Sequence, residues 1–370
     1  MSYKNFSLAK SNILLGSNAF MERLEEVAGR AKNILLAQAM TFEGDDAGRW
    51  LINIMKASPA KDKRLLIDSY SKVVINDHFV KSLKYLKESS FRQEVKSTHY
   101  LIEEAKAAGI QVKFVNPIGF FGQKYPLRNH KKMVVADSSS FLGGINFSDH
   151  NFAWHDMMVE IVDEKLGKAL KEDFDQTWNG TNQSRTIMTD EGQLYLFNGA
   201  KSKVLYDDFF DHVSHAERSI QVISPYISEP LLGVLRSAAA KGVEIEIISP
   251  QENNKSIFKN IILAEQKKGY FKLKEYPGMS HMKAVLIDDE KLIFGSSNYD
   301  LVSYYFEQEV VFVSEDSTLI NEFKSKVLSE VKEINTASGF SSFKTKKATL
   351  LMNMLDKVGG VMSRTILRPH

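Results

Sequence analysis

The sequence of 370 residues contains no cysteine, which excludes a disulfide framework, thiolate zinc sites, iron–sulfur clusters and a cysteine nucleophile. It also lacks an excess of one charge, because 48 basic and 46 acidic side chains leave a net charge of only +2. No stretch approaches the roughly 20 consecutive apolar residues that a membrane-spanning helix needs. The first residues lack the continuous apolar segment of a signal peptide, so we expect a soluble, cytoplasmic protein.

What is present is the composition of a globular protein. Hydrophobic residues make up 43% of the chain and charged residues 25%, which excludes wholesale disorder. Since domains are typically about 150 residues long, a chain of this length predicts two of them.

A weak internal repeat supports that division. In each half an apolar helical pattern precedes a strand-like run, at 33–38 in the first half and 219–227 in the second. Helical and β-rich segments then alternate, which is typical of βαβ units. We therefore predict an α/β fold of two similar halves, each a mixed, mainly parallel sheet flanked by helices, packed about a pseudo-twofold axis.

The pattern also predicts where the domains begin and end. The first half covers 1–185, the second covers 191–340, and a tail covers 341–370. Residues 70–109 make the first half longer and look mostly helical, so we interpret them as an insertion. Residues 179–193 are polar and rich in helix breakers, which is typical of a linker.

Near the end of each half the same motif occurs, H-x-K-x4-D followed by a glycine turn and an asparagine. The first copy comprises His130, Lys132, Asp137 and Asn146, and the second comprises His281, Lys283, Asp288 and Asn298. One copy could arise by chance. Two copies in corresponding places of a repeat, each on a predicted strand, indicate a shared function.

The chemistry follows from the spacing. Alternate residues of a strand point to one face, so the histidine and lysine of each copy project together. If the halves pack about a twofold axis, two histidines, two lysines and two asparagines meet. The ammonium and amide groups then suit the oxygens of a phosphoryl group. One histidine can attack phosphorus while the other protonates the leaving oxygen, a scheme that needs no metal ion and no cofactor.

These residues resemble the phospholipase D superfamily, whose signature is this duplicated motif. Within it the chain is most similar to bacterial cardiolipin synthases. The segments that carry the resemblance are FVNPIGFFGQKYPLRNHKKMVVAD, GGINFSDHNFAWHDMMVEI, HMKAVLIDDEKLIFGSSNYD and YYFEQEVVF. The resemblance implies phosphatidyl transfer through a phosphohistidine intermediate.

It also implies roles for individual residues. His130 would be the nucleophile and His281 the acid and base. The phosphate would be held by Lys132, Lys283, Asn146 and Asn298, and the histidines would be oriented by Asp156 and Glu309. The motif places Asp137 and Asp288 in the catalytic group, although an aspartate at a strand end more often fixes a turn.

The implied substrate is a phospholipid such as phosphatidylglycerol, with the glycerol headgroup of a second phospholipid as acceptor. Two alternatives stay open. One is a phosphodiesterase of the same fold that uses water as acceptor, acting on phospholipid or on nucleic acid. The other is a non-catalytic membrane-binding protein. Aromatic residues near the motifs, Phe120 and Phe121 among them, could line an acyl-chain groove, stack on bases or belong to the core.

The tail adds a possible membrane contact. Its basic residues are Lys344, Lys346, Lys347, Lys357, Arg364 and Arg368, against the single acid Asp356. Apolar residues recur between them at helical spacing. This basic amphipathic segment could bind an anionic membrane surface, at the inner face of the cell membrane, or pack as a helix on the catalytic core.

Overall fold

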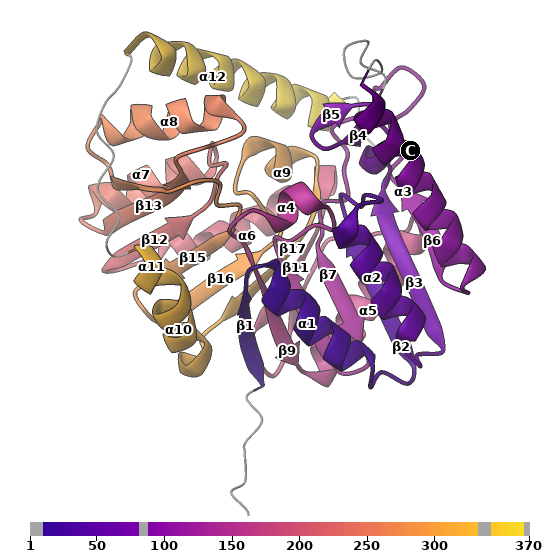
Figure 1. The fold of residues 1–370 in the computed structure, drawn as a ribbon. Helices are drawn as coiled ribbons and strands as arrows, with labels where there is room; N and C mark the ends of the chain where they lie inside the picture. The colour runs from indigo at the N-terminus through magenta and orange to yellow at the C-terminus, as the bar shows by residue number, and fades with distance from the viewer. Residues whose placement is uncertain (1–9, 81–87, 332–341, 366–370) are drawn as a thin grey trace, which may run out of the picture.

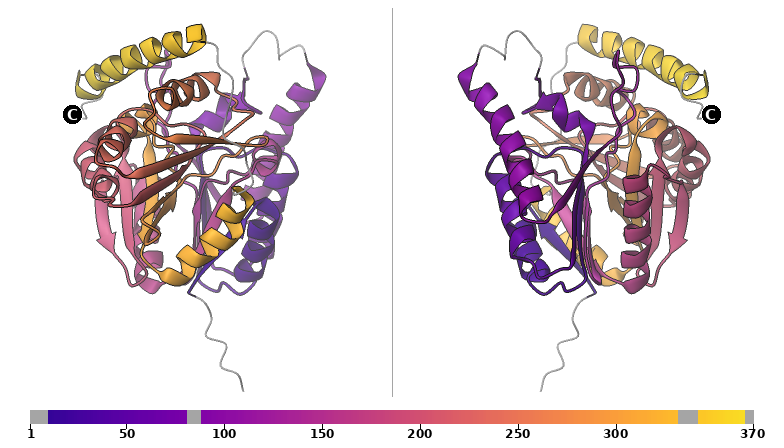
Figure 2. Two further views of the ribbon diagram at one scale, coloured as in Figure 1. Left: turned by 90° about the vertical axis from the view of Figure 1, so that its left-hand side faces the viewer. Right: turned by 90° about the vertical axis from the view of Figure 1, so that its right-hand side faces the viewer.

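The structure is a computed structural model that describes residues 10–80, 88–331 and 342–365. Two mixed sheets, one from each half of the chain, stand face to face with helices on both outer sides (Figures 1 and 2). The predicted α/β fold of two similar halves is therefore confirmed.

The two sheets share one strand order. The first contains, in spatial order, β1 (Ser11–Leu15), β9 (Met157–Val162), β8 (Ser139–Gly143), β7 (Met133–Ala136), β2 (Ile34–Ala39), β3 (Asp62–Asp68) and β6 (Gln111–Val115). The second contains β10 (Arg185–Met188), β11 (Gln193–Asn198), β17 (Gln308–Ser314), β16 (Lys291–Gly295), β15 (Ala284–Ile287), β12 (Ser219–Ile223), β13 (Glu244–Pro250) and β14 (Lys272–Tyr276). From β11 onward the second order repeats the first, and β10 is an additional edge strand inside the predicted linker.

The prediction of mainly parallel sheets holds in one sense only. Most strands of each sheet run in the same direction, but most hydrogen-bonded neighbours are antiparallel. Five of the seven strands in the first sheet run in one direction, and so do five of the eight in the second. Parallel neighbours occur only within β2–β3–β6 and β12–β13–β14 in the described sheets. Those strands are joined by helical crossovers, whereas short turns join β7 to β8, β10 to β11 and β15 to β16 as antiparallel pairs.

Helices cover the outer faces. Those over the first sheet are α1 (Ser17–Ala28), α2 (Asp46–Ala57) and α3 (Ser89–Ala107). Those over the second are α6 (Lys203–Ser214), α7 (Leu231–Ala240), α8 (Ser256–Gln266) and α12 (Ser342–Thr365). The remaining helical segments are η1 (Ser69–Lys72), α4 (Asp149–Phe152), α5 (Glu164–Asn179), η3 (Gly199–Lys201), α9 (Leu301–Tyr305), α10 (Ser317–Phe323), η4 (Lys324–Leu328) and α11 (Ser329–Val331).

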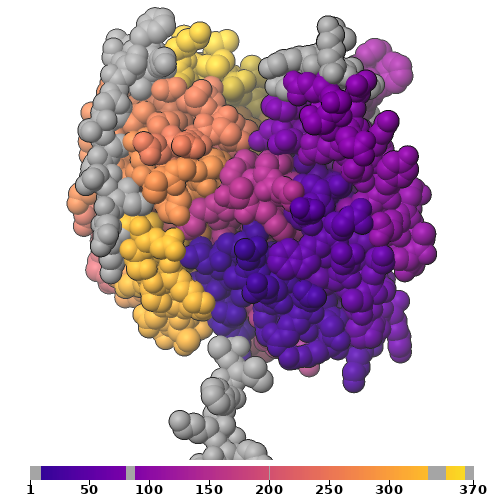
Figure 3. All heavy atoms as spheres, viewed as in Figure 1, coloured from indigo at the N-terminus to yellow at the C-terminus, as the bar shows by residue number. Residues whose placement is uncertain are grey.

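The inner faces of the sheets build one hydrophobic core. It includes Leu142 and Val159 of the first sheet together with Phe294 and Phe312 of the second, all fully buried. In the view of Figure 3, atoms of the magenta segment around residue 150 pack directly against the orange second half. Because the two sheets share this core, the halves pack as one body and hold their motif segments in fixed positions.

The predicted insertion is wrong for its helical part. Helix α3 joins the parallel neighbours β3 and β6 in the way that α8 joins β13 and β14, so α3 belongs to the repeated unit. The additional residues of the first half include the hairpin β4 (Val74–Ile75) and β5 (His78–Phe79) and the longer loop 116–129. A helical pattern alone cannot distinguish a crossover helix from an inserted one. Part of the range, 81–87, lies outside the described residues, and the domain limits stay a prediction.

Helix α12 packs on the second half and also presents apolar residues to solvent. Ala348 and Met352 are buried in the core, whereas Leu350 and Met354 are exposed. At Gly359 a Cβ atom would lie 2.9 Å from the Tyr305 ring, so a glycine permits the close approach there. Among the described residues, no helix combines the length and apolar character needed to cross a membrane.

Candidate active site

Each motif segment is hydrogen-bonded to the opposite half. The backbone N–H of His130 donates to the carbonyl of Gln308 at 2.9 Å, and that of His281 donates to the carbonyl of His155 at 2.7 Å. Each histidine and its lysine lie in extended chain immediately before β7 or β15, rather than within these strands as predicted. The extended backbone preserves the alternation that brings each histidine and lysine to one side.

Buried ion pairs fix the first segment. Lys131 points away from the site, and its Nζ lies 2.6 Å from the carboxylate of Asp173 on α5. Arg128 Nη1 lies 2.5 Å from Asp68 Oδ1, and all four side chains are buried. Removing one partner of such a pair would leave a buried charge without compensation. These pairs therefore hold the register that turns His130 toward the cavity.

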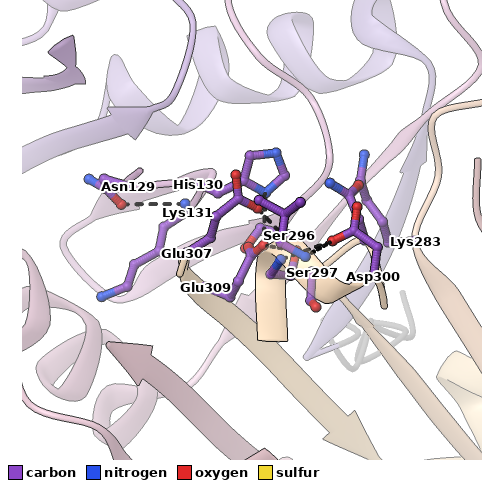
Figure 4. Close-up of polar contacts among 12 residues, drawn as sticks. Asn129, His130, Lys131, Lys283, Ser296, Ser297, Asp300, Glu307 and Glu309 are labelled. Atoms are coloured by element: carbon purple, nitrogen blue, oxygen red, sulfur yellow. Dashed lines mark hydrogen bonds and ion pairs between the residues drawn. The ribbon is translucent and has the colours of Figure 1, made fainter. Parts of the chain in front are cut away.

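Both motif histidines meet a carboxylate from the other half. His130 Nδ1 lies 2.9 Å from Glu309 Oε1 (Figure 4), and His281 Nδ1 lies 3.0 Å from Asp156 Oδ2. Sequence reasoning singled out both carboxylates but did not assign either to a histidine. A carboxylate that accepts from Nδ1–H selects the tautomer with a free electron pair on Nε2. Burial raises the pKa of Asp156 to about 6 and also raises the pKa of Glu309.

The two lysines lie against their own histidines. Lys132 Nζ donates to the His130 carbonyl at 2.7 Å, and Lys283 Nζ lies 2.6 and 2.9 Å from the ring nitrogens of His281. Burial lowers the pKa of Lys132 to about 8 and that of Lys283 to about 7, although nearby carboxylates oppose the shift. These ammonium groups therefore titrate near neutral pH.

The histidines are held neutral in the same way. Burial, followed by the adjacent ammonium group, lowers the pKa of His130 and of His281 well below the ordinary value. A neutral imidazole is the form that can act as a nucleophile. An anion bound between the lysines would offset their charge and raise the pKa of both histidines, which favours protonation of one of them.

The histidines and asparagines of both motifs line one cavity of about 320 Å³. Asn146 Oδ1 accepts from the Thr41 N–H at 3.1 Å, whereas Asn298 Oδ1 is buried with no hydrogen-bond partner in the described part of the chain. The cavity also has an apolar lining from α8, α9 and α12. Its members are Ile257, Phe258, Leu301, Val302, Met352 and Leu355. A polar region is thus continuous with an apolar wall.

The motif aspartates lie elsewhere, and their grouping with the catalytic residues is wrong. Asp137 accepts hydrogen bonds from the backbone N–H groups of residues 32, 33 and 34, and Asp288 from those of residues 217, 218 and 219. Both follow the far end of β7 or β15 from the histidines, at φ of 48° and 54°, and neither lines the cavity. Although burial opposes it, these hydrogen bonds lower the pKa of both carboxylates. Each aspartate therefore fixes a turn against the start of β2 or β12.

Sequence reasoning missed Glu307. Its Oε2 lies 3.9 Å from His130 Nδ1, and the Ser303 hydroxyl lies 3.1 Å from Glu307 Oε2 and 2.8 Å from Glu309 Oε1. Figure 4 shows Glu307 and Glu309 on the same side of the site as His130. Burial raises the pKa of Glu307, and the nearby Glu309 charge adds to that effect. The available signal was the spacing of two residues, which favours placing both glutamates on one side of the chain where β17 begins.

Two groups of described residues could hold a metal ion by position. They are His130 with Glu307 and Glu309, and Glu43 with Asp45 and Glu94, each group offering ligand atoms within 4.8 Å of one another. In the first group, His130 Nδ1 already meets Glu309 in a hydrogen bond. A metal bound through His130 Nδ1 would have to replace that contact, because one ring nitrogen cannot bind both.

Comparison with known families gives the assignment. The family described as "Cardiolipin synthase, PLD-like domain" matches residues 30–178 and 209–330, which include both motif copies. The chain belongs to this family. Of the solved structures, phosphatidylserine synthase from Haemophilus influenzae has the same fold, with a TM-score of 0.69, 12% identity, and coverage of 96% of this chain and 95% of that one.

Curated relatives of this family member include a cardiolipin synthase of Geobacillus thermodenitrificans. It is 29% identical over 262 residues, which cover 62% of this chain and 52% of the relative. A probable cardiolipin synthase of Bacillus subtilis is 24% identical over 372 residues, which cover 90% of this chain and 69% of the relative. The chain thus spans about half the length of the first relative and about two thirds of the second.

Proposed function

We propose that this family member transfers a phosphatidyl group from a phospholipid such as phosphatidylglycerol to the glycerol headgroup of a second phospholipid. The observation that carries the proposal is the single cavity in which two carboxylate-bound histidines stand beside an apolar wall from α8, α9 and α12. The names of the curated relatives point to the same reaction.

The proposed first step forms a phosphohistidine. Lys132, Lys283, Asn146 and Asn298 hold the phosphate. His130 Nε2 then forms a bond to phosphorus as the bond to the donor headgroup oxygen breaks. His281, protonated once the anion is bound, gives its proton to that oxygen. Glu309 and Asp156 keep the two rings oriented through their Nδ1 atoms.

In the second step His281 acts as a base instead of an acid. Neutral His281 removes the proton from the acceptor hydroxyl as the hydroxyl oxygen attacks phosphorus. The nitrogen–phosphorus bond breaks and His130 returns to its starting state. Water in place of the lipid hydroxyl would give hydrolysis, so the acceptor decides between transferase and phosphodiesterase.

The apolar wall favours a lipid over a nucleic acid. Acyl chains attached to the bound phosphate could pack against Phe258, Met352 and Leu355. A nucleic acid has no acyl chains to bury against this wall. The net charge of +2 also offers little attraction for a polyanion.

Peripheral binding at the anionic inner face of the cell membrane belongs to the same proposal. Leu350, Met354 and Val358 of α12 are exposed, and basic residues flank them. A helix with one apolar and one basic face suits the boundary between lipid headgroups and acyl chains. Changing Leu350 and Met354 together to Ser should weaken binding to anionic vesicles, because both apolar side chains are exposed and available to lipid. The variant should still fold, because neither side chain is needed for packing on the core.

The decisive experiment incubates the purified protein, and its His130→Ala variant, with vesicles that contain phosphatidylglycerol. Lipid products are identified by mass spectrometry. Cardiolipin formed by the parent and absent with the variant would support the proposal. Phosphatidic acid would instead identify water as the acceptor. Cleavage of single-stranded DNA without lipid turnover would identify a nuclease.

The roles of the two histidines need a second experiment. With a substrate that carries an activated leaving group, His281→Ala should still form the phosphohistidine, because that leaving group needs no proton. His130→Ala should not form it. If His281→Ala prevents labelling and His130→Ala permits it, the two roles are reversed.

A further inference from the structure

Two adjacent phenylalanines extend from the first half into solvent. Phe120 and Phe121 are 91% and 88% exposed, and their rings meet edge to face at 4.9 Å between centroids. Single exposed apolar residues are common on protein surfaces, but a contiguous apolar patch is a mark of an interaction site. This pair lies in the loop between β6 and β7 that leads into the first motif.

The loop itself holds the pair outward. The Lys124 N–H donates to the Ile118 carbonyl at 2.9 Å, and this hydrogen bond closes the backbone loop that carries the two rings. Gly119 and Gly122, on either side of the pair, have φ of 84° and 75°, a backbone conformation that favours glycine. The exposure of the pair is therefore a product of an ordered turn.

The loop stands beside the cavity. Its Tyr125 ring lies 6.2 Å from the ring of Tyr70, which lines the cavity, and 6.0 Å from the ring of Phe79, which is itself exposed. Leu355 of α12 lines the cavity from the second half. In Figure 1, hairpin β4–β5 and α12 lie at the same end of the molecule. Exposed apolar groups thus flank the cavity from both halves.

We propose that Phe120 and Phe121 insert into the interface of a phospholipid bilayer and, with the exposed residues of α12, hold the cavity mouth against the membrane. The inference rests on the proposed function, because it supplies the route by which a lipid reaches the cavity. Aromatic rings are well suited to the boundary between headgroups and acyl chains.

Charge and geometry favour a bilayer over a protein partner. Exposed lysines accompany both apolar sites, Lys124 beside the phenylalanines and Lys347 and Lys357 on α12. These cations complement anionic headgroups. The two sites come from different halves on either side of the cavity, and one flat anionic surface can contact both while it presents lipid to the cavity.

The test replaces both phenylalanines with serine and measures flotation with vesicles of phosphatidylglycerol and phosphatidylcholine. The double variant should bind these vesicles at least about tenfold more weakly than the parent, because two apolar side chains are no longer transferred from water into the bilayer. Met188→Ser is the matched control. Met188 is 68% exposed and lies in the β10–β11 hairpin, whose Glu191 pairs with Lys10. Lys10 directly precedes β1, and β1 begins at the end of the molecule opposite α12 (Figure 1). Its vesicle binding should equal that of the parent, and the melting temperature shows that each variant folds.

A second measurement reports insertion directly. Phe121→Trp should show a blue-shifted emission with these vesicles and quenching by brominated lipid, relative to the parent. Unchanged vesicle binding by the double variant, or no spectral change in Phe121→Trp, would overturn the proposal. A shift of the double variant from dimer to monomer, with vesicle binding retained, would identify a second copy as the partner and overturn it too.

These outcomes separate the inference from the proposed function. Neither phenylalanine lines the cavity. A water-soluble, short-chain phosphodiester therefore tests the active site without the membrane. If the parent protein turns over no phosphodiester, and the double variant binds vesicles more weakly than the parent, insertion stands and the proposed reaction fails.

Discussion

Asp156 and His281 belong to different halves of the chain, 125 residues apart, yet Asp156 Oδ2 lies 3.0 Å from His281 Nδ1. Glu309 and His130 form the reciprocal contact at 2.9 Å across 179 residues. Each half therefore supplies the carboxylate for the other half's histidine. A site assembled in this way works only when the two sheets are docked.

Removing either carboxylate charge should reduce turnover without unfolding the protein. For Asp156→Asn and Glu309→Gln we expect kcat to fall by about 10²-fold or more, because the rings lose the partner that sets their tautomer. Steady-state kinetics on a soluble phosphodiester measures the change. Asp289→Asn, an exposed carboxylate outside the cavity, is the control. Full activity of both Asp156→Asn and Glu309→Gln would refute an orienting role.

Glu307 should tolerate a change that Glu309 does not. The Ser303 hydroxyl has one hydrogen but contacts an oxygen of each glutamate, so one of these contacts needs a carboxyl O–H as donor. We expect Glu307 to carry that proton, because burial and the Glu309 charge raise its pKa. An ionised Glu307 would also repel a phosphate in the cavity it lines.

Glu307→Gln should therefore keep most of the activity, since an amide N–H can replace the carboxyl O–H, whereas Glu307→Ala should lose activity. Infrared difference spectra between the parent and Glu307→Gln should contain the band of a protonated carboxylic acid at neutral pH. Bands of an ionised carboxylate alone would show that Glu307 is charged.

The motif aspartates should affect stability and not chemistry. Asp137→Ala and Asp288→Ala each remove an acceptor for three backbone N–H groups and should lower the free energy of unfolding by about 1–3 kcal/mol. Urea unfolding measures the loss, and activity per folded molecule should match that of the parent. Both carboxyls have a lowered pKa in the fold, so their stabilisation is present above the ordinary pKa and is lost as pH falls below it. A large fall in kcat with normal stability would return these residues to the catalytic group.

Affinity for a phosphodiester should fall as pH rises through neutrality. Lys283 has a pKa of about 7 and Lys132 of about 8, so each is charged below that value and neutral above it. The inhibition constant of dimethyl phosphate, whose charge is constant over this range, should rise between about pH 6 and pH 9. Lys283→Arg keeps its charge and should flatten the first part of the rise. An inhibition constant independent of pH would show that the lysines do not hold the phosphate.

Much of the fold and part of the site could be predicted from local pattern. The spacing of His130 and Lys132 places both on one side of an extended chain wherever that chain lies, and the repeat indicates that His281 and Lys283 do the same. The strand order is repeated as the pattern predicts. These features depend on residues close together in the sequence.

What could not be predicted depends on contacts between distant segments. Nothing near His130 indicates that its partner is Glu309, because that pairing is produced by the docking of the two sheets. The equivalence of α3 and α8 was hidden by their different lengths. The exposure of Phe120 and Phe121 contradicts the usual preference of phenylalanine for the core, so composition could not reveal it.

The hydrogen bonds that join each motif segment to the opposite sheet have a consequence for how such a chain can change over time. Two tandem copies of one ancestral unit would begin as equals, able to substitute for each other. If each copy depends on its sister for a carboxylate and for backbone pairing, as we propose, a change at these positions in one copy also affects the histidine of the other. The contacts thereby tie the two halves together at the site, while residues outside them, such as the loop that carries Phe120 and Phe121, are free to differ between the halves.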